Sequence, residues 1–117
     1  MTIFEGITAN RVETPRYTAN VLEHGGEGEV PVVFIHGNAS SSLFWQPTMQ
    51  DLPVRSLAID LRGFGDSEPK PLDASRGVRD FSDDVASVLD AQGISRAHLV
   101  GWSMGGGVVM QLMLDRP

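Results

Sequence analysis

The chain has 117 residues, of which 41% are hydrophobic and 21% are charged, and its net charge at pH 7 is −6. This length suits a single domain with a real hydrophobic core. The acidic balance argues against nucleic acid or an anionic membrane as a partner, because both attract basic surfaces. The absence of cysteine excludes disulfides, thiolate metal ligands and a cysteine nucleophile.

The N-terminus lacks the basic and apolar pattern of a secretory signal, and no run approaches the roughly 20 apolar residues that span a bilayer. We therefore expect a soluble cytoplasmic protein. The pattern along the chain alternates strands with helices, starting with two short strands in residues 7–25 that turn near Pro15, followed by a glycine-rich loop at residues 25–31.

Three apolar runs predict buried strands at residues 32–35, 56–60 and 97–101, and three helices are predicted at residues 40–52, at residues 78–92 and directly after Ser103. Serines can cap the first helix, and Gly93 is placed to end the second. Strands that alternate with helices in this way predict the α/β class, with a mostly parallel sheet and flanking helices.

A serine between two glycines follows the third buried strand, in the sequence GWSMGG. A nucleophile on a sharp strand-to-helix turn, a nucleophile elbow, needs strained backbone and neighbours without Cβ atoms. Gly101 and Gly105 meet this need on either side of Ser103, and the helix N-terminus there favours negative charge. Residues 105–107 are all glycine, and each weakens a helix by up to about 1 kcal/mol relative to alanine. This cost favours a functional reason over a merely structural turn.

The loop after the first buried strand, HGNASSS, is the candidate for part of an oxyanion hole. Such a hole needs two N–H donors that converge on one point, one of them from the residue after the nucleophile. Met104 fits that role, and the Asn38 backbone could supply the second donor. The Asn38 side chain either faces substrate or braces the turn. We expect His36 to hold the loop by hydrogen bonds rather than to carry a proton.

The segment after the second buried strand, DLRGFGDS, is interpreted as a fixed turn rather than a phosphate cradle. It lacks a third glycine and a following Gly-Lys-Ser/Thr. We expect Arg62 to pair with Asp60 or Asp66, and Gly63 and Gly65 to permit positive φ.

In this order and spacing, VFIHGNASSSLFW, LAIDLRGFGDS and HLVGWSMGG resemble the α/β-hydrolase fold family. The match covers nearly all of residues 1–117 and corresponds to the N-terminal portion of a single domain, without the family's last strands and cap. The loop HGNASSSLFW is similar to that of haloalkane dehalogenases, but these and epoxide hydrolases have an aspartate in place of Ser103. The serine implies the esterase, lactonase, C–C hydrolase and cofactor-free haloperoxidase branches, although the last have an aromatic residue where this chain has Asn38.

The family's triad runs serine, acid, histidine along the chain, and this sequence does not supply the last two. The acid after Ser103 is Asp115, at the far end of the following helix, and all three histidines precede the serine. One hypothesis is the N-terminal part of a serine hydrolase that is inactive alone. The other is a non-catalytic α/β remnant that binds a partner chain or self-associates through strand 97–101, which the resemblance places at an exposed sheet edge.

The hydrolase hypothesis implies that Ser103 attacks a small ester-like substrate, that the Asn38 and Met104 N–H groups hold the oxyanion, and that water releases an acyl-enzyme. No metal or organic cofactor is implied. Ester, lactone, thioester, C–C bond and peracid chemistry all stay open. Four large side chains could line an apolar pocket or belong to the core, namely Trp45, Phe64, Trp102 and Met104.

Overall fold

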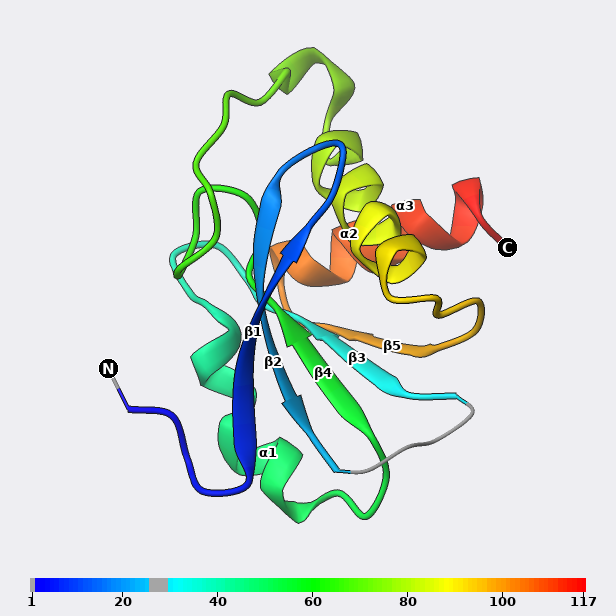
Figure 1. The fold of residues 1–117 in the computed structure, drawn as a ribbon. Coiled ribbons are helices and arrows are strands. Elements are labelled where there is room, and N and C mark those ends of the chain that lie inside the picture. Colours follow the sequence, from blue (N-terminus) through cyan, green and yellow to red (C-terminus); the bar gives the residue numbers. More distant parts are fainter. Residues whose placement is uncertain (1, 26–29) are drawn as a thin grey trace.

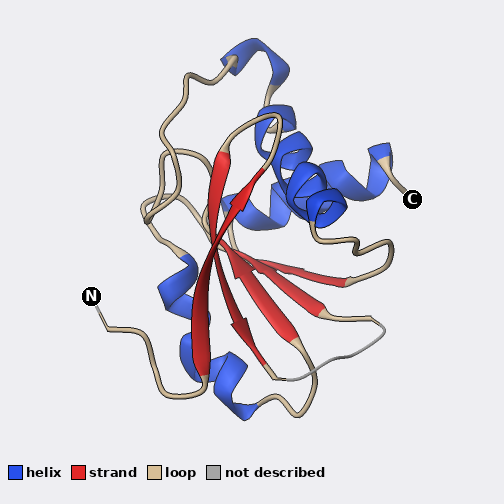
Figure 2. Ribbon diagram, viewed as in Figure 1, coloured by secondary structure: helices blue, strands red, loops and turns tan. Residues whose placement is uncertain are grey.

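The computed structural model describes residues 2–25 and 30–117, and it shows one five-stranded sheet with helices on both faces (Figure 1, Figure 2). The strands lie in the order β1-β2-β4-β3-β5. Their bounds are β1 Ile7–Glu13, β2 Thr18–His24, β3 Val32–Ile35, β4 Ser56–Ile59 and β5 His98–Gly101. Most of the predicted glycine-rich loop, residues 26–29, lies outside the described residues.

The predicted helices are present at α1 Gln46–Asp51, α2 Arg79–Ala91 and α3 Met104–Asp115, with short 3₁₀ turns at η1 Ser42–Trp45 and η2 Ala74–Arg76. The first predicted helix is therefore two pieces, η1 and α1, and the Ser41 hydroxyl caps the start at 3.3 Å from the Leu43 nitrogen. Gly93 follows α2 with a φ of +69°, the left-handed conformation that ends many helices. No helix among the described residues is long and apolar enough to cross a membrane.

The α/β class is confirmed, and the sheet is mixed. β3 pairs in parallel with β4 and with β5, whereas β2 is antiparallel to both β1 and β4. The two predicted N-terminal strands form a hairpin whose turn contains Pro15, with the Thr14 N–H donating to the Tyr17 carbonyl at 3.1 Å. The carboxyl ends of β3, β4 and β5 consequently lie together at one end of the parallel strands (Figure 1).

Side chains alternate along the strands and fill a core on each face. The core under α2 and α3 includes Val33, Ile35, Leu57, Ile59, Val85, Val88 and Val108. The smaller core under α1 consists of Ile7, Leu22, Phe34, Trp45, Met49 and Ala58. Because both faces of β3 and β4 are covered, these strands are continuous apolar runs in the sequence. β5 lies at the edge and alternates between exposed and half-buried residues.

Candidate active site

Ser103 lies on the sharp turn between β5 and α3, directly before the first residue of the helix. Its backbone has φ 56° and ψ −119°, and its side chain is exposed. A non-glycine residue pays about 1–3 kcal/mol for such a conformation and keeps it only where its surroundings enforce it. The strained strand–turn–helix geometry that a nucleophile elbow requires is therefore present at this serine.

The glycines on either side of Ser103 are required by close approach of the backbone. A Cβ on Gly101 would lie 2.3 Å from the Gly105 carbonyl oxygen, and a Cβ on Gly105 would lie 2.2 Å from the Ile35 carbonyl oxygen. Both distances are far below van der Waals contact, so α3 begins directly against the ends of β3 and β5. A Cβ on Gly107, in contrast, would meet nothing within 4 Å. Packing among the described residues thus explains Gly105 but not the whole glycine run.

The loop after β3 lies against this turn. A Cβ on Gly37 would lie 2.8 Å from the Trp102 ring, and the Trp102 N–H donates to the Ile35 carbonyl at 3.2 Å. Asn38 follows Gly37 and is exposed. Within the described part of the chain, neither the Asn38 N–H nor the Met104 N–H donates a hydrogen bond. The two predicted oxyanion donors are therefore unpaired N–H groups, one on the loop after β3 and one on the first residue of α3, and their role stays a prediction.

His36 is fully buried, and both of its ring nitrogens are occupied. The Leu61 N–H donates to Nε2 at 3.1 Å, so Nδ1 carries the proton and donates to the Gly37 carbonyl at 2.8 Å. Burial lowers the pKa of His36, which keeps the ring neutral. This arrangement fits the predicted role of His36 as a support for the loop.

The other two histidines lie at the opposite end of the strands from Ser103. His24 pairs with Ser56 at the beginning of β4, and His98 begins β5. His98 precedes Ser103 by five residues of roughly 3.3 Å each, so neither ring is near the serine hydroxyl. Among the described residues, no three His, Asp or Glu side chains are arranged to hold a metal ion.

Residues 32–116 match the model of the alpha/beta hydrolase family. The chain belongs to the α/β-hydrolase family. Over 97 residues it is 41% identical to a protein of Variovorax paradoxus (strain S110) named "Putative carbamate hydrolase RutD", a match that covers 80% of this chain and 36% of the relative. It is 32% identical over 101 residues to the "Uncharacterized carboxylesterase nap" of Bacillus subtilis (strain 168), covering 84% of this chain and 33% of the relative.

A solved structure of the epoxide hydrolase VrEH1 from Vigna radiata superimposes with a TM-score of 0.87 at 30% identity, covering 99% of this chain and 38% of that one. A haloalkane dehalogenase DbeA-M1 loop variant from Bradyrhizobium elkanii gives a TM-score of 0.84 at 32% identity, with 96% and 37% coverage. This α/β-hydrolase chain thus spans about a third of the length of these similar proteins. The names of these similar proteins are those of a carbamate hydrolase, a carboxylesterase, an epoxide hydrolase and a haloalkane dehalogenase.

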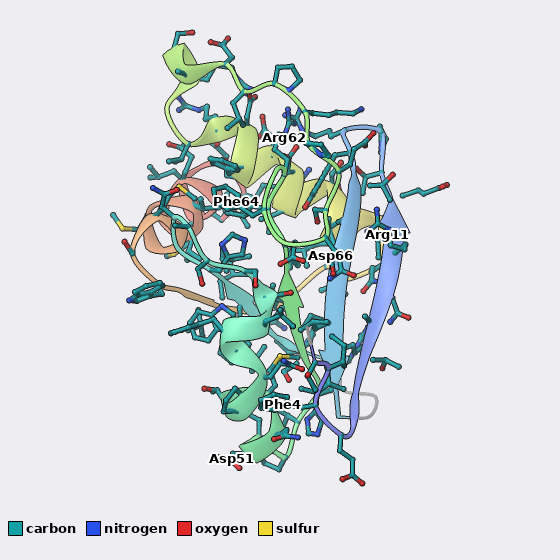
Figure 3. The ribbon with its side chains drawn as sticks, turned by 90° about the vertical axis from the view of Figure 1, so that its left-hand side faces the viewer. Phe4, Arg11, Asp51, Arg62, Phe64 and Asp66 are labelled. Carbon is teal, nitrogen blue, oxygen red and sulfur yellow. The ribbon has the colours of Figure 1, made fainter. Side chains whose placement is uncertain are left out.

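In this α/β-hydrolase chain, the loop after β4 is a fixed turn, but its arginine does not pair as predicted. Figure 3 shows Arg62, Phe64 and Asp66 along this loop. The Arg62 Nε and Nη2 donate to the two carboxylate oxygens of Asp84 on α2, each at 2.6 Å. The expected pairing with Asp60 or Asp66 is wrong, because the Asp60 carboxylate accepts N–H groups instead. Asp84 was missed because nothing local in the sequence marks a partner 22 positions away.

The four large side chains that were expected either to line a pocket or to belong to the core differ in their burial. Trp45 is buried in the core under α1, and Phe64 and Met104 pack partly buried on the other core. Trp102 is 47% exposed beside Ser103 and stacks on Phe44, with ring centroids 5.0 Å apart. Only Trp102 of the four lies largely open to solvent next to the candidate nucleophile.

Proposed function

We propose that the chain is the N-terminal portion of a single serine hydrolase domain of esterase or lactonase type, which acts on a small carbonyl substrate through an acyl-enzyme on Ser103. The observation that supports this most strongly is the strained and exposed position of Ser103, held by Gly101 and Gly105 at distances that exclude a Cβ. A turn with no reactive role has no need of an exposed hydroxyl at its strained residue.

The reaction follows from the groups around the turn. The Ser103 Oγ loses its proton to a base and attacks the carbonyl carbon, and the carbonyl oxygen becomes an oxyanion. The free N–H groups of Asn38 and Met104 bind that oxyanion, and the N-terminus of α3 adds a favourable dipole. The base returns the proton to the leaving group, and water then cleaves the acyl-enzyme. Loss of one such donor typically costs about 3 to 4 kcal/mol in the transition state.

The base and the triad acid come from outside these 117 residues in this proposal. The buried ring of His36 has no free nitrogen, and His24 and His98 lie at the opposite end of the strands from Ser103. A serine hydroxyl without a base is a weak nucleophile at neutral pH. We therefore expect the 117-residue chain by itself to be inactive, and the complete protein to be active.

Labelling with a fluorophosphonate tests this proposal on the complete protein. An activated serine attacks phosphorus, the P–F bond breaks, fluoride leaves, and the serine proton passes to the base. We expect one adduct, located on Ser103 by peptide mass analysis, and no adduct in Ser103→Ala. A Ser95→Ala variant, which alters an exposed serine in the loop before β5, serves as the matched control and should label like the wild type. Hydrolysis of p-nitrophenyl acetate that survives in Ser103→Ala would contradict the proposal.

A second candidate function is assembly of two copies through the free edge of β5. Val100 on this strand is 39% exposed and lies on the α1 face of the sheet, beside Phe34. On the other face, α3 carries Met110, Met113 and Leu114 at 66%, 60% and 78% exposure. In an antiparallel β5–β5 pair, the α3 helices of both copies lie on the same face, which would bring apolar side chains of the two helices to one side of the joined sheet.

Sedimentation velocity of the 117-residue chain tests the assembly. We expect a dimer whose dissociation constant rises at least tenfold in Val100→Lys, because a lysine there places its charge beside the paired edge. Val54→Lys is the matched control, since Val54 is 46% exposed in the loop before β4 and lies away from the edge. A wild-type chain that stays monomeric at millimolar concentration would rule out this second function.

A further inference from the structure

The loop that carries Asn38 is fastened at both of its ends to the end of β4. At one end, the Leu61 N–H donates to Nε2 of His36 at 3.1 Å. At the other end, the Ser42 N–H donates to Oδ1 of Asp60 at 2.7 Å. Asp60 and Leu61 directly follow β4, so two adjacent residues at the carboxyl end of the central strand hold the start and the finish of this loop.

Asp60 is itself held at every polar group. Its N–H donates to the Asn20 carbonyl at 3.0 Å, and its carbonyl accepts the Tyr17 hydroxyl at 3.0 Å and the Ser67 hydroxyl at 2.7 Å. Its second carboxylate oxygen, Oδ2, accepts the Asn20 amide at 3.0 Å and the Asp66 N–H at 3.1 Å. Asp60 is only 1% exposed, so its carboxylate is a buried and fixed hydrogen-bond acceptor for the loop.

Two backbone features fit this anchoring. A Cβ on Gly65, whose φ is +53°, would lie 2.3 Å from the Asp60 carboxylate, so a glycine is needed where the turn closes over it. Ala39, in the loop between His36 and Ser42, has a φ of +58°. Apart from Ser103, it is the one non-glycine residue with positive φ in the described ranges 2–25 and 30–117. A strained residue persists where its surroundings over-determine it.

We propose that Asp60 is a positioning residue for the oxyanion site: through the Ser42 N–H it sets where the Asn38 N–H lies relative to Ser103. This inference rests on the proposed serine hydrolase function. A buried carboxylate is a costly way to gain stability alone, because the charge loses its hydration. A carboxylate with fixed N–H donors does, however, define the position of the loop sharply, and an oxyanion donor must lie within a few tenths of an ångström of its place.

Asp60→Asn in the complete protein is the first variant of the test. The asparagine keeps the shape of the side chain and one acceptor oxygen. That oxygen is best used at the Oδ2 position with its two donors, which leaves the NH₂ group facing the Ser42 N–H. We expect the rate of fluorophosphonate labelling at saturation to fall at least tenfold, with the half-saturating concentration within twofold of wild type. Asp66→Asn, an exposed carboxylate on the same turn, is the matched control and should change neither.

Ser42→Pro supplies the second variant, because it removes the N–H that Asp60 accepts while leaving Asp60 intact. Ser42 is the first residue of η1, and Ser41 before it is extended with φ −160° and ψ 178°, so the backbone there can accept a proline. The proline ring occupies the position of the N–H that points at Asp60, so it also pushes the loop away from the carboxylate. We expect a similar loss of labelling rate, and no further loss when Asp60→Asn is added, since both changes remove one interaction. Labelling rates within twofold of wild type in both folded single variants would overturn the positioning role while leaving the hydrolase proposal standing. A wild-type protein that is not labelled at all would overturn both.

Discussion

The glycines in the first turn of α3 fall into two kinds, and single alanine substitutions separate them. Gly105→Ala places a Cβ 2.2 Å from the Ile35 carbonyl oxygen, and backbone cannot move aside easily. We expect it to lower the free energy of unfolding by about 3 kcal/mol. Gly107→Ala places a methyl group in open space, and we expect it to raise that free energy by up to about 1 kcal/mol through helix propensity. Urea denaturation of both variants measures the difference. A Gly105→Ala variant as stable as wild type would contradict the close approach.

His36 predicts how stability responds to mild acid. Burial lowers its pKa from the ordinary value near 6.5. At a pH between the folded and unfolded pKa values, the unfolded chain binds more protons than the folded one. The contribution of the neutral His36 ring to the free energy of unfolding is therefore complete above the unfolded pKa, and it declines as the pH falls below that value. We expect that decline in urea denaturation as the pH falls through the unfolded value near 6.5. His36→Gln should flatten it. An unchanged slope in His36→Gln would show that the buried ring is not its source.

At the scale of elements, a buried ion pair joins α2 to the loop that follows β4. The Asp84 side chain has no exposed surface, and it accepts Arg62 on both oxygens and Arg16 at 2.7 Å. The hydrogen bond to Asp84 raises the pKa of Arg62, so the guanidinium stays charged. We expect Asp84→Asn to lower the free energy of unfolding by about 3 to 5 kcal/mol, because it leaves a buried cation without its partner.

The matched control for Asp84→Asn lies on the neighbouring position of the same helix. Asp83 has a side chain that is 36% exposed, and among the described residues it pairs only with the exposed Arg76. Asp83→Asn should cost less than about 1 kcal/mol in the same urea denaturation experiment, since exposed pairs contribute little. Equal losses in the two variants would mean that the helix charge, rather than the buried pair, stabilises α2.

The elements and the Ser103 turn could be predicted from the sequence because their determinants are local. The strands β3 and β4 are apolar runs, Pro15 marks the hairpin turn, and Gly101 and Gly105 are each two positions away from Ser103. The Arg62–Asp84 pair and the tether from Asp60 to Ser42 could not be predicted in this way. Their partners are 22 and 18 positions apart, and several carboxylates near Arg62 fit the sequence equally well until the fold places them.

At the scale of the whole molecule, the two edge strands of the sheet carry different side chains. β1 at one edge is a hairpin strand with mostly exposed side chains, whereas β5 at the other edge has apolar side chains exposed on the strand itself and on α3. A free apolar edge of this kind favours pairing with a further strand. The same edge ends at Ser103, so any strand that pairs with β5 in parallel would bring its carboxyl end to the candidate nucleophile.

Amide hydrogen exchange of the 117-residue chain reports directly on this edge. The His98 N–H donates to Pro31 at 2.9 Å and the Trp102 N–H to Ile35 at 3.2 Å, so the alternate N–H groups of Leu99 and Gly101 point away from β3. In dilute solution we expect these two amides to exchange near unprotected rates, while Ala58, paired on both sides within β4, exchanges only on global unfolding. Protection of Leu99 and Gly101 that rises with chain concentration would support pairing of two copies through β5. Protection equal to that of Ala58 at every concentration would contradict the bare edge, because an N–H that faces solvent cannot be shielded by the sheet it does not join.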